Sequence, residues 1–377
     1  MKIWVIGRSY PEPSNNMMGS FEYEQAKMLQ KNGEEVYYLC CSLHLNKVIK
    51  GWGYQSWEES GMKICTYSKH FFPRVFPLYF LKLRNHLWSK FLQRVCEKNG
   101  WPDIIHVHYP AMMMVADALR PFHQMGIKIV VTEHWTKVLT KSLDFIEIKA
   151  YRKYFEYIDT CICVGSPLVN AIKEIKGNNI TPIYVVPNVV DQEFQPSMIK
   201  HDGFEFIAVG RLVKVKQFDQ IVRAFTKCFR EKPARLTIVG GGEEYDTLKK
   251  LINNLSMKKQ IMLTGSLPRR QVAERIANAD CLVCYSRFET FGVPIIEAWA
   301  CGIPTITTTM VAAVIDNFDS RLGMEVPFND IDNLEEKMRY MYDNNSLFDK
   351  KFISRFAQEN FSERVIYQQL KRIYMEQ

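Results

Sequence analysis

The chain has 377 residues, of which 47% are hydrophobic and 24% charged, with a formal net charge of +8, and this balance is typical of a soluble globular protein large enough for two domains. No run approaches the roughly 18 apolar residues of a membrane-spanning helix, and the opening residues 1–7 are too short for a signal peptide. The ten cysteines lie in apolar segments without metal-ligand spacing, which argues against a disulfide scaffold or a metal cluster and favours the cytoplasm, where thiols stay reduced.

The first half of the chain alternates strands and helices. Residues 1–7 and 36–40 are apolar runs typical of buried strands, and a helix over 21–30, closed by Gly33, lies between them. The loop before this helix is polar and is not a G-x-G-x-x-G fingerprint. Further strands are expected at 103–108, 129–134, 159–166 and 183–186. This alternation predicts a doubly wound, Rossmann-like parallel sheet in an α/β domain over residues 1–190.

The positive charge is concentrated in this first half. Residues 1–190 hold about 23 Lys and Arg against 16 Asp and Glu, whereas the remainder holds 26 against 25. A helix over 78–97 has an apolar stripe with basic residues between, which fits either core packing or an interfacial membrane element. We interpret the stripe as core, and the preceding Phe71–Arg74 loop as the better membrane candidate.

Two histidines stand at strand ends. His108 ends the strand over 103–108 and His134 ends the next strand, so both are expected at the carboxyl edge of the sheet, where doubly wound folds bind ligands. Each could instead be a satisfied core histidine. His106 lies inside its strand and is interpreted as structural.

The second half repeats the pattern after a linker over 191–201. A strand over 204–209 leads into Gly210-Arg211 with Lys216 five residues later, and strands over 236–239 and 261–264 follow. Two fixed cations at a strand end suit a diphosphate, although a basic surface turn is the simpler alternative. These elements predict a second doubly wound domain over 200–360, and a closing helix over 361–377 is expected to pack back on the first domain.

Residues 279–304 hold the main candidate site residues of the second domain. An apolar strand over 279–285 leads into a loop with Glu289 and Gly292, and a helix follows with Pro294 near its start and Glu297 in its expected first turn. Free amides at a helix start suit a phosphate, and a carboxylate there can accept two sugar hydroxyls. The alternative is a surface glutamate and a helix-dipole glutamate.

Two glutamates eight residues apart, with Phe291-Gly292 between them and a small-residue helix after, resemble the signature of retaining GT-B glycosyltransferases. The chain is most similar to glycosyltransferase family 4 (glycosyl transferases group 1). The resemblance implies two Rossmann-like domains facing each other across a cleft, the first binding the acceptor and the second the donor. It implies hexosyl transfer from a nucleotide diphosphate sugar to an acceptor hydroxyl with retention, without a cofactor or metal.

The resemblance also assigns roles to residues. Glu289 would lie by the donor sugar, Glu297 would bind the ribose, and His134 and His108 would lie on the acceptor side. Catalysis would depend on His134, Glu289, Arg211 and Lys216. The residues implied in donor binding are Gly19, Arg211, Lys216, Ser266, Leu267, Glu289, Phe291, Gly292, Val293 and Glu297.

The chain departs from the family pattern where glycine is usual, at Met18, Val189, Gln217 and Ala312-Ala313. Two rivals stay open. One is a GT-B nucleotide-sugar epimerase, which needs an acid/base set across the diphosphate that the sequence does not identify. The other is a non-catalytic protein that binds sugar nucleotides or membranes, which the departures at Met18, Val189 and Ala312-Ala313 favour. Asp330-Ile331-Asp332 resembles a metal-binding D-x-D but precedes a helix, so a capping role is expected. The acceptor is expected to be a glycan or lipid-linked glycan of cell-surface polysaccharide assembly, with peripheral contact to an anionic membrane surface and no nucleic-acid partner.

Overall fold

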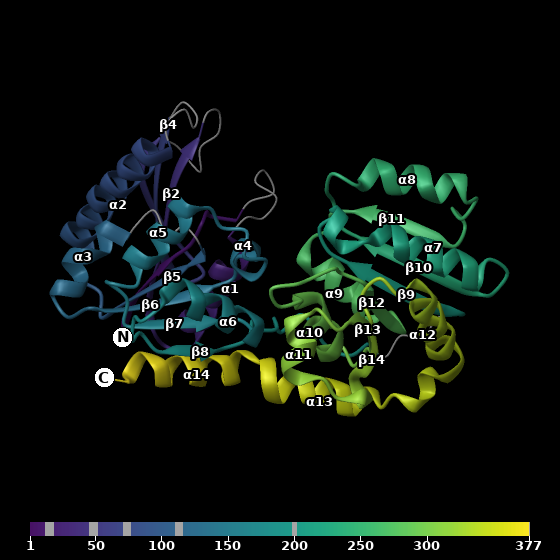
Figure 1. Cartoon of the computed structure of the whole chain (residues 1–377). Coiled ribbons are helices and arrows are strands. Elements are labelled where there is room, and N and C mark those ends of the chain that lie inside the picture. The colour runs from purple at the N-terminus through teal and green to yellow at the C-terminus, as the bar shows by residue number, and fades with distance from the viewer. Residues whose placement is uncertain (12–18, 45–51, 71–76, 110–115, 198–201, 377) are drawn as a thin grey trace. The chain divides into compact units, whose positions relative to one another are not determined.

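The computed structural model describes residues 1–11, 19–44, 52–70, 77–109, 116–197 and 202–376. The chain forms two compact units, which Figure 1 shows in ribbon form. The first unit holds Met1–Val186 together with Tyr367–Gln377, and the second holds Pro187–Ile366. The sequence places the first boundary at residue 190, and the structure places it after Val186.

The first unit is built on an eight-stranded sheet in the order β3-β4-β2-β1-β5-β6-β7-β8. All neighbouring strands are parallel except β3 and β4, which form an antiparallel pair at one edge. The strands are β1 (Lys2–Ile6), β2 (Glu35–His44), β3 (Gly53–Glu59), β4 (Met62–His70), β5 (Ile104–His108), β6 (Lys128–Glu133), β7 (Thr160–Cys163) and β8 (Ile183–Val185).

Helices cover this sheet. They are α1 (Ser20–Lys31), α2 (Pro77–Asn99), α3 (Ala116–Gln124), α4 (Thr136–Leu139), α5 (Phe145–Tyr154) and α6 (Ser166–Lys176). The apolar stripe of α2 is core, as expected: Trp88, Phe91 and Leu92 are at most 1% exposed. The membrane candidate Phe71–Arg74 lies outside the described residues. Among the helices of the described ranges, none is long and apolar enough to cross a lipid bilayer.

The last helix, α14 (Glu363–Met375), joins the first unit from Tyr367 onward. The Tyr374 hydroxyl lies 2.5 Å from His106 Nδ1 on β5, and the Lys128 ammonium on β6 donates to the Ile373 carbonyl at 2.5 Å. Tyr367 donates to Glu34 at 2.6 Å. These bonds tie the end of the chain to the first sheet.

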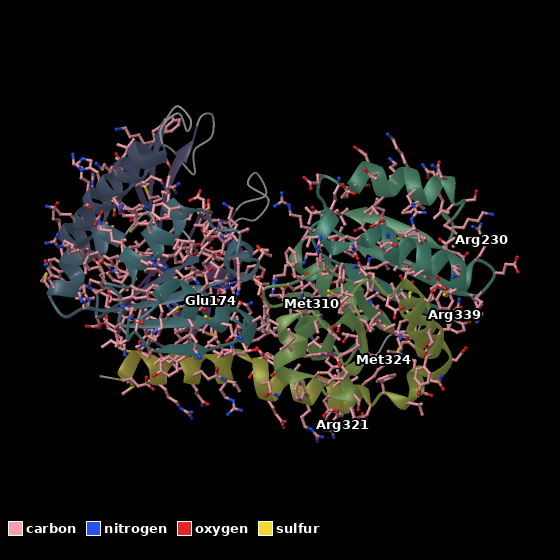
Figure 2. All side chains as sticks on the ribbon, viewed as in Figure 1. Glu174, Arg230, Met310, Arg321, Met324 and Arg339 are labelled. Carbon is pink, nitrogen blue, oxygen red and sulfur yellow. The ribbon has the colours of Figure 1, made fainter. Side chains whose placement is uncertain are left out.

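The second unit is built on a six-stranded, all-parallel sheet in the order β11-β10-β9-β12-β13-β14. Its strands are β9 (Phe204–Val209), β10 (Ala234–Val239), β11 (Ile261–Gly265), β12 (Cys281–Cys284), β13 (Thr305–Thr308) and β14 (Gly323–Val326). Its helices are α7 (Phe218–Phe229), α8 (Tyr245–Asn254), α9 (Arg269–Ala277), α10 (Val293–Ala300), α11 (Ala312–Asn317), α12 (Ile331–Asn344) and α13 (Lys350–Phe361). Arg230, Arg321 and Arg339 project outward from this unit, as Figure 2 shows.

Both sheets reverse their strand order at one point, between β1 and β5 in the first and between β9 and β12 in the second. The predicted doubly wound parallel sheets are therefore confirmed, whereas their meeting across a cleft stays a prediction. In open α/β sheets, ligands bind beyond the carboxyl ends of the strands at this point of reversal. Gly210–Gln217 follows β9 and Tyr285–Gly292 follows β12, so the two predicted donor segments leave the sheet side by side.

Candidate active site

The loop after β12 holds Glu289 inside the second unit. The Lys216 ammonium forms an ion pair with Glu289 Oε1, and the two side chains are 19% and 13% exposed. Ser286 Oγ, itself buried, donates to the same oxygen at 2.9 Å. The Arg287 amide donates to the Val215 carbonyl at 2.8 Å, which ties this loop to the turn that carries Lys216. The structure therefore brings two predicted site residues into direct contact.

The segment after β9 presents the two predicted cations differently. Lys216 lies in a short 3-10 turn, η3 (Lys214–Lys216), and reaches Glu289. Arg211 is exposed, and within the described part of the chain it has no ion-pair partner. Gln217 has φ 51°, in the left-handed region, which explains why the resembling family prefers glycine there. The departure at Gln217 thus keeps the backbone shape at some cost in strain.

The start of α10 faces the same edge of the sheet. Gly292 precedes the helix with φ 97°, and a Cβ there would lie 2.5 Å from Val311 Cγ1. A glycine is therefore required at this position. The helix begins at Val293 and has no side-chain cap. Pro294 has no amide hydrogen and the Ile295 amide donates to the Gly292 carbonyl at 2.9 Å, so among the first three residues the Val293 amide is the one left for an anion.

Glu297 lies in the second turn of α10, so its expected place in the first turn is wrong. The helix begins at Val293, and Glu297 is its fifth residue. Its side chain is nearly buried, and Arg269 Nη2 lies 3.2 Å from its Oε1. Burial raises the pKa of Glu297, while Arg269 lowers it. Arg269 was not predicted as a site residue.

Glycines pack closely where the segments after β9 and β10 meet. A Cβ on Gly240 would lie 1.9 Å from the Gly210 carbonyl oxygen, and one on Gly242 would lie 2.4 Å from the Leu212 carbonyl oxygen. This close backbone packing positions the segment that carries Arg211. Ser266 is exposed and Leu267 half-buried just beyond β11, at the same carboxyl edge.

Histidines and aromatic rings gather at the carboxyl edge of the first sheet. His108 Nδ1 lies 3.1 Å from His134 Nε2, and the Tyr109 ring stacks on His134 with centroids 4.6 Å apart. Both histidines are nearly buried, and burial holds the pKa of each well below its usual range. They are therefore neutral near pH 7 and suited to hydrogen bonding. His106 is structural, as predicted, because Thr132 and Tyr374 contact its ring.

Arg8 and Glu22 complete this edge and were missed from the sequence. The Arg8 guanidinium lies 3.4 Å from the Tyr109 ring centroid, and its Nε donates to the fully buried Glu22 at 2.9 Å. Gly7-Arg8 follows β1 just as Gly210-Arg211 follows β9, and this parallel was an available signal. Gly19 precedes α1 with φ 95°, and a Cβ there would lie 2.0 Å from the Ser9 carbonyl oxygen. Met18 lies outside the described residues.

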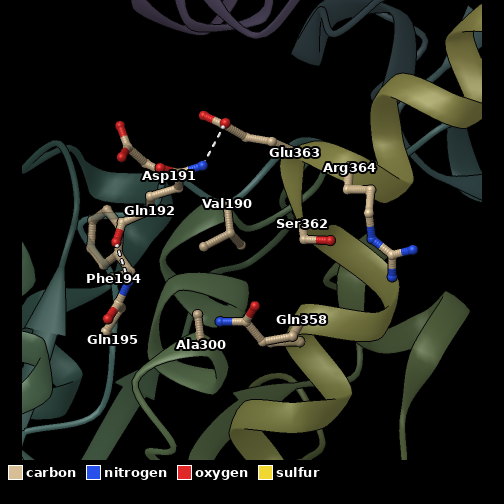
Figure 3. Close-up of a pocket in the computed structure, with 11 residues that line it drawn as sticks. Val190, Asp191, Gln192, Phe194, Gln195, Ala300, Gln358, Ser362, Glu363 and Arg364 are labelled. Carbon is tan, nitrogen blue, oxygen red and sulfur yellow. Dashed lines mark hydrogen bonds between the residues drawn. The ribbon is translucent and has the colours of Figure 1, made fainter. Parts of the chain in front are cut away.

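A surface pocket of the second unit lies beside Asp191, where the chain passes between α10 and the junction of α13 with α14 (Figure 3). Gln192 donates to Glu363 at 2.9 Å across it. None of the predicted donor residues lines this pocket, so we build the candidate site on the ion pairs and helix start described above. Within the described ranges, no three His, Cys, Asp or Glu side chains gather as metal ligands, and Asp330 caps α12 by accepting from the Asn333 amide at 2.9 Å.

Two doubly wound sheets with this order and these edge residues define a GT-B glycosyltransferase fold. Residues 189–359 match the family model described as Glycosyl transferases group 1, and residues 19–194 match Glycosyltransferase Family 4. The chain belongs to these glycosyltransferases, as the sequence predicted.

Two curated relatives illustrate the similarity. N-acetyl-alpha-D-glucosaminyl L-malate synthase of Bacillus anthracis is 29% identical over 342 residues, covering 86% of this chain and 84% of that protein. The phosphatidylinositol N-acetylglucosaminyltransferase GPI3 subunit of Saccharomyces cerevisiae is 26% identical over 220 residues, covering 55% of this chain and 48% of that protein. The second match therefore spans about half of its relative.

Solved structures share the fold at low identity. Sucrose-phosphate synthase of Thermosynechococcus elongatus gives a TM-score of 0.79 at 17% identity, covering 99% of this chain and 98% of that one. Anabaena HepE in complex with UDP-glucose gives 0.76 at 15% identity, covering 99% of each chain.

Proposed function

We propose that this protein is a retaining hexosyltransferase that moves a sugar from a nucleoside diphosphate donor to an acceptor hydroxyl. The observation that carries the proposal is the Lys216–Glu289–Ser286 contact beside the exposed Arg211, at the point where the second sheet reverses its strand order. Two cations and a helix start at one strand edge suit a diphosphate leaving group.

The diphosphate would be held by Arg211, Lys216 and the amides near Phe291, Gly292 and Val293. These groups would offset the negative charge that develops as the bond between the sugar and the phosphate breaks. The acceptor hydroxyl would attack from the same face, and the leaving phosphate oxygen would take its proton. Catalysis would then be mostly positioning and charge stabilisation, with fixed cations in place of a metal.

On the acceptor side, the neutral His134 would accept or donate one hydrogen bond to a sugar or acceptor hydroxyl. His108 would hold the ring through the contact between His108 Nδ1 and His134 Nε2. Ser266 and Leu267 would contact the base, Glu297 the ribose, and Glu289 the donor sugar next to Lys216. Gly19 would let the backbone at the start of α1 approach the donor.

The names of the relatives suggest which sugar to test first. The two curated relatives described above carry N-acetylglucosaminyl groups in their names, one with L-malate and one with phosphatidylinositol. We therefore propose an N-acetylhexosaminyl donor as the first candidate. A lipid-linked glycan in cell-surface polysaccharide assembly remains the proposed acceptor. It would bring the cytoplasmic protein to the inner face of a membrane through its basic first unit.

A donor screen tests the proposal. UDP, GDP and ADP sugars are incubated with the protein, and hydrolysis, thermal stabilisation and the product are followed. A ligand at a hundred times its Kd should raise the free energy of unfolding by about 2.7 kcal/mol. The proposal is supported if the sugar is transferred to a glycan and NMR of the product shows that its anomeric configuration is the same as in the donor.

The same screen separates the rivals. An epimerase would return a new nucleotide sugar instead of a free nucleoside diphosphate, and a non-catalytic protein would be stabilised without any turnover. The departures from glycine at Met18, Val189 and Ala312-Ala313 are the reason to test the non-catalytic alternative. Inversion at the anomeric carbon would refute the retaining mechanism alone.

A further inference from the structure

Arg269 occupies an unusual position in the second unit. It is the first residue of α9, and its guanidinium lies between two carboxylates, 3.1 Å from Asp191 through Nε and 3.2 Å from Glu297 through Nη2. The guanidinium carbon also lies 5.0 Å from the ring centroid of the buried Phe194. One arginine therefore joins α9, α10 and the segment after Val190.

The position of Arg269 at the start of α9 does not stabilise that helix. Cations at a helix N-terminus oppose the macrodipole, and α9 begins with two of them. Arg270 forms an ordinary surface pair with Glu274 one turn later, and its side chain is 82% exposed. Arg269 is 36% exposed and is directed at Glu297 and Asp191 instead. A contact outside its own helix offsets its unfavourable position.

We propose that Arg269 is a positioning residue for ribose recognition, which holds the Glu297 carboxylate ionised and in one orientation for the ribose hydroxyls. This proposal rests on the ribose role of Glu297 proposed above. Arg269 contacts Oε1, and among the described residues no partner contacts Oε2. A fixed carboxylate with one oxygen available loses less freedom when a hydroxyl binds.

The charges around Glu297 set the direction in which each substitution should shift its pKa. Arg269 stabilises the charged form of Glu297 and lowers its pKa, whereas the Asp191 carboxylate raises it, in addition to the larger effect of burial. Glu297 also interacts with the buried thiol of Cys301, just after α10, whose pKa is raised by burial first and by Glu297 second. Loss of Arg269 and loss of the Asp191 charge should therefore shift the pKa of Glu297 in opposite directions.

The test compares UDP with 2′-deoxy-UDP by calorimetry on the full chain, because the ratio of their affinities isolates the ribose contact from the phosphates. If UDP does not bind, GDP and ADP are used with their 2′-deoxy forms. We expect the wild type to prefer the ribose form by about tenfold at pH 7.5, as for a hydrogen bond to a charged group. Arg269→Ala should reduce this preference to about threefold or less, and Arg269→Lys should restore part of it.

The pH dependence of the ribose preference distinguishes the proposed role of Arg269 from a merely structural one. The pH below which the preference disappears should rise in Arg269→Ala and fall in Asp191→Asn, as the two charges require. Arg270→Ala is the matched control, since it removes the neighbouring cation without touching Glu297, and it should match wild type. Melting curves confirm that each variant is folded, and Arg269→Lys serves if the alanine variant does not fold.

The outcomes are distinguishable. If Glu297→Gln loses the ribose preference but the Arg269 variants keep both the preference and its pH profile, the inference about Arg269 is overturned while the donor site stands. If Glu297→Gln also keeps the preference, or if none of the three nucleotides binds, the proposed ribose site is wrong and the role of Arg269 falls with it.

Discussion

Replacing Lys216 by Ala tests the centre of the candidate site. The substitution removes the ammonium that pairs with Glu289 and leaves that carboxylate with Ser286 as its remaining partner. It should affect turnover and stability separately, because the ammonium would serve the departing diphosphate during reaction and Glu289 in the resting protein.

The structure sets the size of both effects. Losing one positioned charge at a developing phosphate should slow turnover by at least about a hundredfold, or roughly 2.7 kcal/mol. Breaking a fully buried pair costs about 3–5 kcal/mol. Since Lys216 and Glu289 retain some exposure, solvent screening reduces the expected loss of unfolding free energy to about 1–2 kcal/mol. The variant should therefore stay folded.

Single-turnover rates with the true donor and urea unfolding measure the two effects. Lys214→Ala is the matched control, because Lys214 lies in the same turn and is exposed. Arg211→Ala should slow turnover to a similar degree with no loss of stability, since its side chain is exposed. Adding Glu289→Gln to Lys216→Ala should restore stability but not the rate.

A rate near wild type for both Arg211→Ala and Lys216→Ala would refute the diphosphate assignment. Equal slowing by Lys214→Ala would point to a general effect of charge on the surface. If the double variant is no more stable than Lys216→Ala, the unpaired carboxylate is not the source of the instability.

Three further predictions follow from other parts of the chain. Activity should persist in excess EDTA, and Asp330→Asn should change little because asparagine also caps a helix; full loss of activity restored by Mn²⁺ would contradict this. Wild type should float with anionic liposomes at low salt, because each Lys or Arg near an anionic surface contributes about 1 kcal/mol to the binding free energy. A variant with Lys69 and Arg74 changed to Glu and Phe71 and Phe72 changed to Ser should not float. Equal flotation of both proteins would refute membrane binding through this segment. Burial raises the pKa of Glu133 to about 7. The contribution of its protonated form to stability is therefore present below about pH 4.5 and lost as pH rises through 7. Between these limits the free energy of unfolding of Glu133→Gln, measured in urea, should gain up to about 3 kcal/mol relative to wild type by pH 8. An identical pH dependence of the two proteins would show that Glu133 titrates normally.

Much of the fold could be predicted from the sequence, because the strands of a parallel sheet are buried on both faces and appear as continuous apolar runs. The strands β1, β9 and β12 were found in this way. The edge strand β3 was not, because its residues are mostly half-buried or exposed and its sequence is polar. The candidate donor segments could be predicted because Arg211, Lys216 and Glu289 lie in the loops that follow β9 and β12.

Other parts of the site depend on contacts that spacing does not encode. The sequence placed Glu297 in the first turn of its helix, whereas it lies in the second turn because α10 begins one residue before Pro294. Arg269 was missed because its partners Asp191 and Glu297 lie far from it in sequence. The burial of His108 and His134 depends on contacts between successive strand ends, such as the Tyr109 ring stacked on His134 and the pairing of the two histidines, which no local pattern reports.

The division of the chain has a consequence for the order of folding during synthesis. The second unit is an insertion in the first, because Tyr367–Gln377 returns to the sheet that Met1–Val186 forms. A ribosome must therefore complete Pro187–Ile366 before it makes Tyr367 and Tyr374, the partners of Glu34 and His106. Until then the first sheet lacks part of its cover, and the buried His106 ring has the Thr132 hydroxyl but not the Tyr374 hydroxyl. The first unit therefore gains its last cover only when α14 docks, after the second unit has been made.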